Sequence, residues 1–242
     1  MSDRSAAVTS TVTAIGLTFG SYVAGAIVIV LTGMLLGQVG ISLAERPGLR
    51  LLASTVLLQG VTFGGIALVY LTVRDTEPGF VSVSVPDLRG TITTFVGILV
   101  LIALLVTTSW VLSTFGLEAA QNQVVEIGQQ NPKVFLLLVP LSFLLVGPGE
   151  ELLFRGLVQG TLRESLSPVR AIVLASALFA SIHLFSLSGE GKLVYIGLVF
   201  VLALVLGGIY EYTGNLTVPA LVHGAYNAVQ FAVAYLNATG GI

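Results

Sequence analysis

Ionisable side chains in the later apolar stretches of this 242-residue chain are few, and they gather in three short clusters. The clusters are Glu150-Glu151 with Arg155, Phe179 with His183, and His223 with Asn227. His183 and His223 are the only two histidines, and both lie among apolar residues. Glutamate and histidine are common acids and bases in catalysis. Because their burial in an apolar segment is costly, such residues are usually functional. The clusters therefore predict a site for acid–base chemistry.

The first cluster contains two glutamates that helical geometry directs to different surroundings. Residues four apart lie on one face of a helix, so Glu151 can pair with Arg155. Glu150 is rotated by about 100° from its neighbour and cannot easily share that arginine. We therefore expect a structural Glu151–Arg155 ion pair, and a Glu150 that faces a cavity as a general base or acid. Pro148-Gly149, directly before the glutamates, leaves two alternatives open: a helix that breaks there, or one that continues with a kink.

The two histidine clusters supply the remaining polar groups. His223 and Asn227 are four residues apart, so they are expected to project together into the bundle. An imidazole N–H beside a carboxamide N–H₂ is suited to bind an oxyanion. His183 comes from a neighbouring helix and could orient a water molecule together with Glu150. Phe179 is expected to be a packing residue.

A metal site is the alternative use of these residues. Zinc would take Glu150, His183 and His223 as ligands, which are residue types that bind it. The HExxH arrangement, which places two histidine ligands and a base on one helix, is absent from the sequence. Asn227 offers an amide where a metal site would favour a stronger ligand. The pattern favours a mechanism without a metal or other cofactor, and zinc stays the alternative.

The composition decides what kind of protein positions these clusters. Charged residues make up only 9 % of the chain, against about a quarter in soluble domains. Hydrophobic residues reach 55 %, and the mean hydropathy is +0.99. Lysine and arginine number 10 against 12 acidic residues, which argues against nucleic-acid binding. The composition excludes a soluble enzyme and predicts an all-α, polytopic transmembrane helix bundle.

The apolar stretches set the expected number of membrane spans. About 20 apolar residues are needed to cross a bilayer, and seven stretches qualify, which predicts about seven to eight spans. They fall near residues 12–39, 51–73, 91–116, 134–162, 168–187, 193–212 and 216–236. The segment 118–133 is expected to form an interfacial helix. Trp110, Tyr195, Tyr210 and Tyr212 are expected to be interfacial anchors. The whole chain, 1–242, is interpreted as one domain.

The three clusters, in this order, resemble the motifs of the CPBP family of intramembrane proteases, also called the Abi family. That family includes the type II CAAX prenyl endopeptidases, and its motifs are EExxxR, FxxxH and HxxxN. They correspond here to Glu150-Glu151-x-x-x-Arg155, Phe179-x-x-x-His183 and His223-x-x-x-Asn227. The resemblance covers about residues 134–236, which would be the catalytic core. It implies a glutamate-dependent endopeptidase whose site opens into a cavity within the bundle.

The resemblance also implies a role for each matching residue. Glu150 and His183 would activate water, and His223 and Asn227 would stabilise the oxyanion. In addition to these four residues, Glu151 and Arg155 would support the helix. The implied partners are membrane lipid and a membrane-associated protein or peptide, which would be prenylated in a CAAX-type reaction. We expect a multi-pass protein of the plasma membrane.

Two other functions compete with proteolysis at this stage. Intramembrane Glu, His and Arg also suit an ion-coupled transporter or proton relay. The sequence has no recognisable inverted repeat, which speaks against a transporter. A non-catalytic membrane scaffold is the third hypothesis, and the complete set of polar site residues argues against it.

Overall fold

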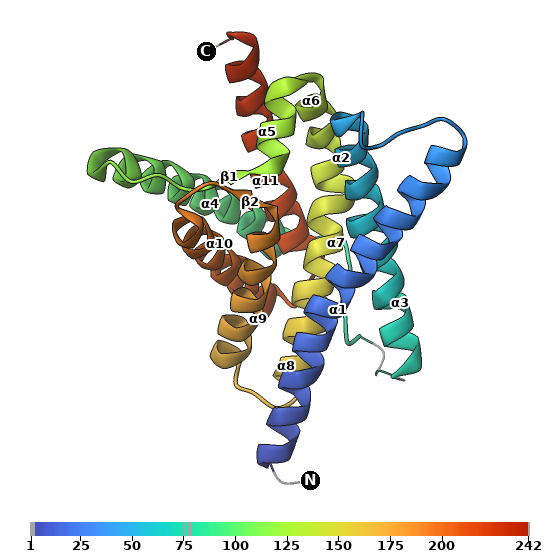
Figure 1. Cartoon of the computed structure of the whole chain (residues 1–242). Helices are drawn as coiled ribbons and strands as arrows, with labels where there is room; N and C mark the ends of the chain where they lie inside the picture. The colour runs from blue at the N-terminus through green and yellow to red at the C-terminus, as the bar shows by residue number, and fades with distance from the viewer. Residues whose placement is uncertain (1–2, 75, 77–78, 242) are drawn as a thin grey trace.

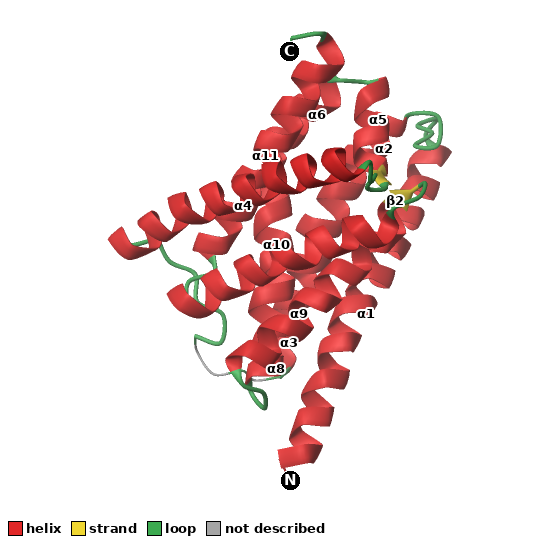
Figure 2. Cartoon of the chain, turned by 90° about the vertical axis from the view of Figure 1, so that its left-hand side faces the viewer, coloured by secondary structure: helices red, strands yellow, loops and turns green. Residues whose placement is uncertain are grey.

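The computed structural model describes residues 3–74, 76 and 79–241, and the described chain is almost entirely helical (Figures 1 and 2). The helices that precede Glu150-Glu151 and the turns around them are α1 (Asp3–Gln38), α2 (Pro47–Thr55), α3 (Gly64–Val73), α4 (Leu88–Phe115), α5 (Gln123–Gln130) and α6 (Lys133–Leu141). The later helices are α7 (Gly147–Glu151), α8 (Gly160–Arg163), α9 (Pro168–Ile182), α10 (Lys192–Thr213) and α11 (Thr217–Thr239). Wider π-helical turns form η1 (Val56–Phe63), η2 (Ser142–Val146) and η3 (Leu152–Gln159), and η4 (His183–Ser186) is a 3₁₀ turn.

The predicted helical membrane bundle is confirmed. Among the described residues, six helical stretches are long and apolar enough to cross a membrane. They are Arg4–Gln38, Pro47–Val73, Leu88–Phe115, Lys133–Arg163, Pro168–Ser186 and Lys192–Thr213. The seventh expected span corresponds to α11, which has 23 residues but is not among the six. Polar side chains such as His223, Asn227 and Gln230 make α11 less apolar than the other long helices.

The fourth span continues through Pro148 without a break, which decides between the two alternatives left open by the sequence. Helical turns follow one another from Lys133 to Arg163. Proline has no N–H to donate to the preceding turn, and this loss usually kinks or breaks a helix. Here the wide turn η2 ends just before Gly147-Pro148, so the chain absorbs the proline within a continuous helix. The two glutamates therefore lie in the middle of a span.

Helix α11 packs unusually closely against this fourth span. A Cβ atom on Gly147 would lie 2.5 Å from the backbone oxygen of Ala220, and one on Gly224 would lie 2.9 Å from that of Ser142. Real Cβ atoms essentially never come closer than 3.0 Å to such atoms. Glycine at both positions therefore lets the two backbones approach. Gly224 directly follows His223, so this approach carries the histidine to the glutamates.

The segment 118–133 is only partly the interfacial helix that the sequence predicts. Strand β1 (Gln121–Asn122) pairs antiparallel with β2 (Leu187–Ser188), and α5 begins directly after β1. The Asn122 side chain accepts a hydrogen bond from the backbone N–H of Val124 and so caps α5. The strand pair ties this segment to the chain just after His183. Helices α4 and α10 run steeply across the direction of α1 and α11 (Figure 2).

Candidate active site

A cavity of about 470 Å³ lies between η1, α4, α10, α11 and the fourth span. Its lining includes all four residues that the sequence places in the catalytic machinery: Glu150, His183, His223 and Asn227. Most of the remaining wall is apolar and includes Leu101 and Leu105 of α4 and Leu198 and Leu202 of α10. The tertiary structure therefore joins three distant sequence clusters in the wall of one mostly apolar cavity.

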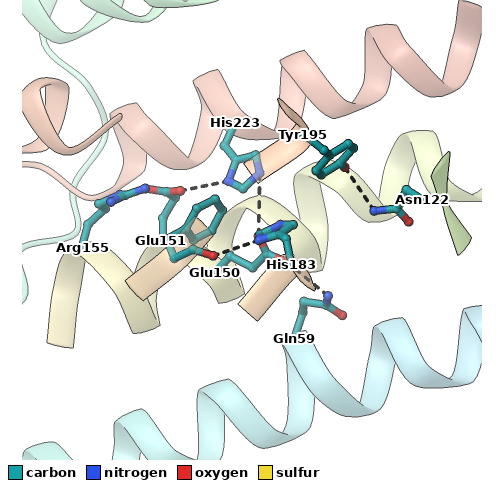
Figure 3. Close-up of polar contacts among 9 residues, drawn as sticks. Gln59, Asn122, Glu150, Glu151, Arg155, His183, Tyr195 and His223 are labelled. Carbon is teal, nitrogen blue, oxygen red and sulfur yellow. Dashed lines mark hydrogen bonds and ion pairs between the residues drawn. The ribbon is translucent and has the colours of Figure 1, made fainter. Parts of the chain in front are cut away.

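Glu150 faces this cavity, as the helical geometry predicts. Its side chain is 11 % exposed, and its Oε2 lies 3.8 Å from Nε2 of His223. The other carboxylate oxygen, Oε1, accepts a hydrogen bond of 3.4 Å from Nε2 of Gln59 (Figure 3). The carboxylate also interacts electrostatically with His183. Gln59 and the two histidines therefore position the Glu150 carboxylate, and none of these three side chains carries a permanent positive charge.

Glu151 is fully buried and connects two of the clusters. Its Oε2 accepts a hydrogen bond from Nε of Arg155 at 2.9 Å, which is the predicted ion pair. Its Oε1 lies 2.9 Å from Nδ1 of His223 (Figure 3). This second contact was not predicted. It orients the imidazole, so that Nε2 of His223 is directed towards Glu150.

His183 is held by a backbone contact at the start of the 3₁₀ turn. Its Nδ1 lies 2.9 Å from the backbone oxygen of Phe179. A carbonyl oxygen only accepts hydrogen bonds, so Nδ1 must carry the proton. In the neutral ring, Nε2 then has a free lone pair and can accept a hydrogen bond or a proton.

Phe179 packs between the charged and polar groups of the site, as expected. Its side chain is buried, and its ring centroid lies 4.7 Å from that of His183 and 6.0 Å from that of His223. The guanidinium carbon of Arg155 lies 5.3 Å from the centre of the same ring, within cation–π distance. Phe154 meets it edge-on at 4.9 Å. Phe179 therefore sets the spacing of both histidines.

Asn227 lies in the cavity wall one helical turn after His223. Its side chain makes no hydrogen bond with any described residue, so its amide group is available to a ligand in the cavity. Among the described residues, no group of three His, Cys, Asp or Glu side chains is arranged to hold a metal ion. The zinc alternative keeps its candidate ligands Glu150, His183 and His223, but they do not form such a group.

Three residues of this site were not predicted from the sequence: Gln59, Asn122 and Tyr195. Gln59, from the second span, contacts Glu150. Tyr195 was expected to be an interfacial anchor, but it lines the cavity and accepts a hydrogen bond of 3.1 Å from Asn122. The strand pair brings Asn122 to the start of α10, which gives Tyr195 a partner that the sequence does not indicate. These contacts join residues far apart in the chain, and the spacing of motifs carries no signal for them.

A comparison with known proteins finds a match in the region of the chain that carries the three motifs. Residues 132–229 match a family model described as Rce1-like, type II CAAX prenyl endopeptidase. The matched segment begins at the fourth span and includes all three motifs, so it confirms the resemblance that they indicate. No curated protein and no solved structure matches the chain. The match supports a CAAX-type protease in a membrane and identifies neither the catalytic residues nor the substrate.

Proposed function

We propose that this protein, whose residues 132–229 match the type II CAAX prenyl endopeptidases, is a glutamate-dependent intramembrane endopeptidase. Its substrate would be a membrane-associated protein or peptide, with CAAX-type prenylated proteins as the favoured class. One observation carries the proposal: Glu150, His183, His223 and Asn227 all line one cavity. The apolar remainder of the cavity suits a lipidated or membrane-embedded segment of the substrate.

Water activation is assigned to Glu150 with His183. In this mechanism Glu150 removes a proton from a water molecule as its oxygen attacks the scissile carbonyl carbon. His183 interacts electrostatically with this carboxylate and has a free lone pair on Nε2, so it can share the proton that Glu150 takes. When the tetrahedral intermediate collapses, the C–N bond breaks and the proton on Glu150 passes to the leaving amine. Water is consumed, and the products are a carboxylic acid and an amine, which exchange a proton to give a carboxylate and an ammonium ion.

Oxyanion stabilisation is assigned to His223 with Asn227. Nδ1 of His223 is committed to Glu151, so the ring must carry a second proton to donate from Nε2. The fully buried ion pair with Arg155 balances the charge of one glutamate, and a protonated His223 would balance the other. Asn227 supplies a neutral N–H donor that has no hydrogen-bond partner among the described residues. Donors held in place before the reaction are worth roughly 10²–10³-fold in kcat.

Hydrolysis without a metal is part of this proposal. Its support is that a carboxylate base, an imidazole and two oxyanion donors already provide the groups that peptide hydrolysis requires. Treatment with EDTA separates this route from the zinc alternative. Cleavage that is lost with EDTA and restored by Zn²⁺ would overturn the metal-free route and leave the protease assignment intact.

The test is cleavage of prenylated and unprenylated membrane peptides by the purified protein in detergent. We expect cleavage by the wild-type chain, and loss of cleavage with Glu150→Ala or His183→Ala while folding is retained. Glu45→Ala, the same change at an exposed loop residue, should cleave like the wild type. Retained cleavage in both site variants would refute the assignment. Absence of cleavage by the wild type, with proton flux that Glu150→Gln abolishes, would favour a transporter.

The proposal also includes the membrane in which the protein is located. The six apolar helical stretches make this an integral membrane protein. We place it in the plasma membrane with a membrane-associated substrate. Fractionation of cells that express the tagged protein tests this placement directly, since recovery in an internal membrane would refute it.

A further inference from the structure

Gln59 reaches the site from outside the segment that carries the three motifs. It lies in η1, a π-helical stretch of the second span, 91 positions before Glu150. Its Nε2 donates the 3.4 Å hydrogen bond to Oε1 of Glu150, and its side chain lines the cavity. π-Helical segments inside α-helices are rare, and they occur frequently at functional sites. Figure 3 shows Gln59 approaching Glu150 from a separate helix.

The backbone contact that brings Gln59 to this position requires a glycine. A Cβ atom on Gly149 would lie 2.3 Å from the backbone oxygen of Gln59 and 3.1 Å from its Cβ. Any other residue at 149 would push η1 away from α7. Gly149 directly precedes Glu150, so the same close approach places the carboxamide beside the carboxylate. The second and fourth spans therefore approach each other closely at this pair of side chains.

Only the nitrogen of the Gln59 carboxamide has a hydrogen-bond partner within the described chain. Its Nε2 has a partner, whereas its Oε1 is buried and has no hydrogen-bond partner among the described residues. Leaving a buried acceptor unsatisfied costs about 1–3 kcal/mol, so a donor is expected to occupy this position during function. Oε1 can only accept, and the ligand that satisfies it must present an O–H or N–H group.

We propose that Gln59 holds the water molecule that attacks the substrate; this inference rests on the proposed function. The attacking water has two O–H groups. One gives its proton to Glu150, and the other donates to Oε1 of Gln59. With both hydrogens directed to acceptors, an oxygen lone pair points towards the scissile carbonyl. Nε2 of Gln59 meanwhile fixes the carboxylate that takes the proton. Gln59 is thus a catalytic residue that the three motifs do not contain.

The test compares kcat and KM for Gln59→Leu, which removes both the donor and the acceptor at similar size. We expect kcat to fall by about 100-fold, as misplacement of a reacting group by about 1 Å does, with KM nearly unchanged. Gln59→Asn keeps an amide on a shorter side chain. It should show the same kcat loss and so covers the case in which Gln59→Leu fails to fold.

Gln159→Leu is the matched control. Gln159 is fully buried, and its Oε1 likewise has no hydrogen-bond partner in the described part of the chain, but it is not in the cavity lining. Its kcat should equal that of the wild type. In the Glu150→Ala background, Gln59→Leu should cause no further loss, because both residues act on the same water.

The outcomes separate this inference from the proposed function. Wild-type kcat in Gln59→Leu or Gln59→Asn, together with loss of cleavage in Glu150→Ala, would overturn the role of Gln59 and leave the protease standing. An equal kcat loss in Gln159→Leu would also overturn it, because the effect would then be structural. Cleavage unaffected by Glu150→Ala would refute the proposed function, and this inference with it.

Discussion

Glu151 and Arg155 form a buried ion pair whose two members should not be equally costly to remove. Both side chains are completely buried. Glu151 has two partners, Arg155 and His223, each at 2.9 Å. Arg155 has one ion-pair partner within the described residues, and its two terminal nitrogens have no hydrogen-bond partner there. The asymmetry predicts that Glu151→Gln destabilises the protein more than Arg155→Met.

The expected magnitudes follow from these contacts. Glu151→Gln leaves a fully buried guanidinium without a counter-charge, which costs about 3–5 kcal/mol of unfolding free energy. Arg155→Met removes one hydrogen bond between charged groups, worth about 1.5–3 kcal/mol. It also removes two unpartnered buried nitrogens, and His223 remains beside the carboxylate, so the net cost should lie in the lower half of that range. The difference of about 2 kcal/mol corresponds to roughly a 30-fold change in the folding equilibrium.

The assay is reversible unfolding in mixed micelles, followed by loss of helical circular dichroism as denaturing detergent is added. Glu164→Gln is the matched control, because Glu164 pairs with Arg74 at 2.7 Å on the exposed surface. That pair should be worth less than about 1 kcal/mol. If Arg155→Met were as destabilising as Glu151→Gln, the conclusion that Glu151 has a second effective partner in His223 would be refuted.

Three further predictions concern the cavity. Gly149→Ala should lower kcat about as much as loss of the Gln59 side chain, because its Cβ would displace η1; unchanged steady-state kinetics would contradict the close contact. Asn227→Ala should lower kcat by roughly 10²–10³-fold and leave thermal unfolding unchanged, since the amide makes no hydrogen bond with the described chain; a large stability loss would argue for a structural role. Tyr195→Phe should cost about 0.5–1.5 kcal/mol through its bond with Asn122 while kcat is preserved, and complete inactivation would show that Tyr195 does more than form the cavity wall.

Two classes of feature could be predicted from the sequence because they depend on local properties. Apolar length predicts membrane helices, since every backbone polar group in lipid must be paired within its own segment. Helical spacing predicts the Glu151–Arg155 pair, because residues four apart share a face in any α-helix. The different direction of Glu150, about 100° away around the helix, follows from the same geometry. The catalytic roles assigned to the cavity residues stay predictions until the cleavage assays are done.

Two features of the chain resisted prediction for an equally physical reason. Tyr195 is aromatic and lies near a helix start, which is the usual pattern of an interfacial anchor. Its contact with Asn122 depends on a two-residue strand pair that propensity does not indicate. Continuity of the fourth span through Pro148 depends on the widened turn before it, and local preference for a break there is overridden by packing against α11.

The sequence by itself determined that this is a helical membrane protein with three acid–base motifs, because composition and i, i+4 spacing are properties of the chain alone. Only the tertiary structure decided which of these groups meet. The Glu151–His223 contact joins residues 72 positions apart, and the Gln59–Glu150 contact joins residues 91 positions apart. Such distances are set by how closely two backbones approach, and here glycines at 147, 149 and 224 permit that approach.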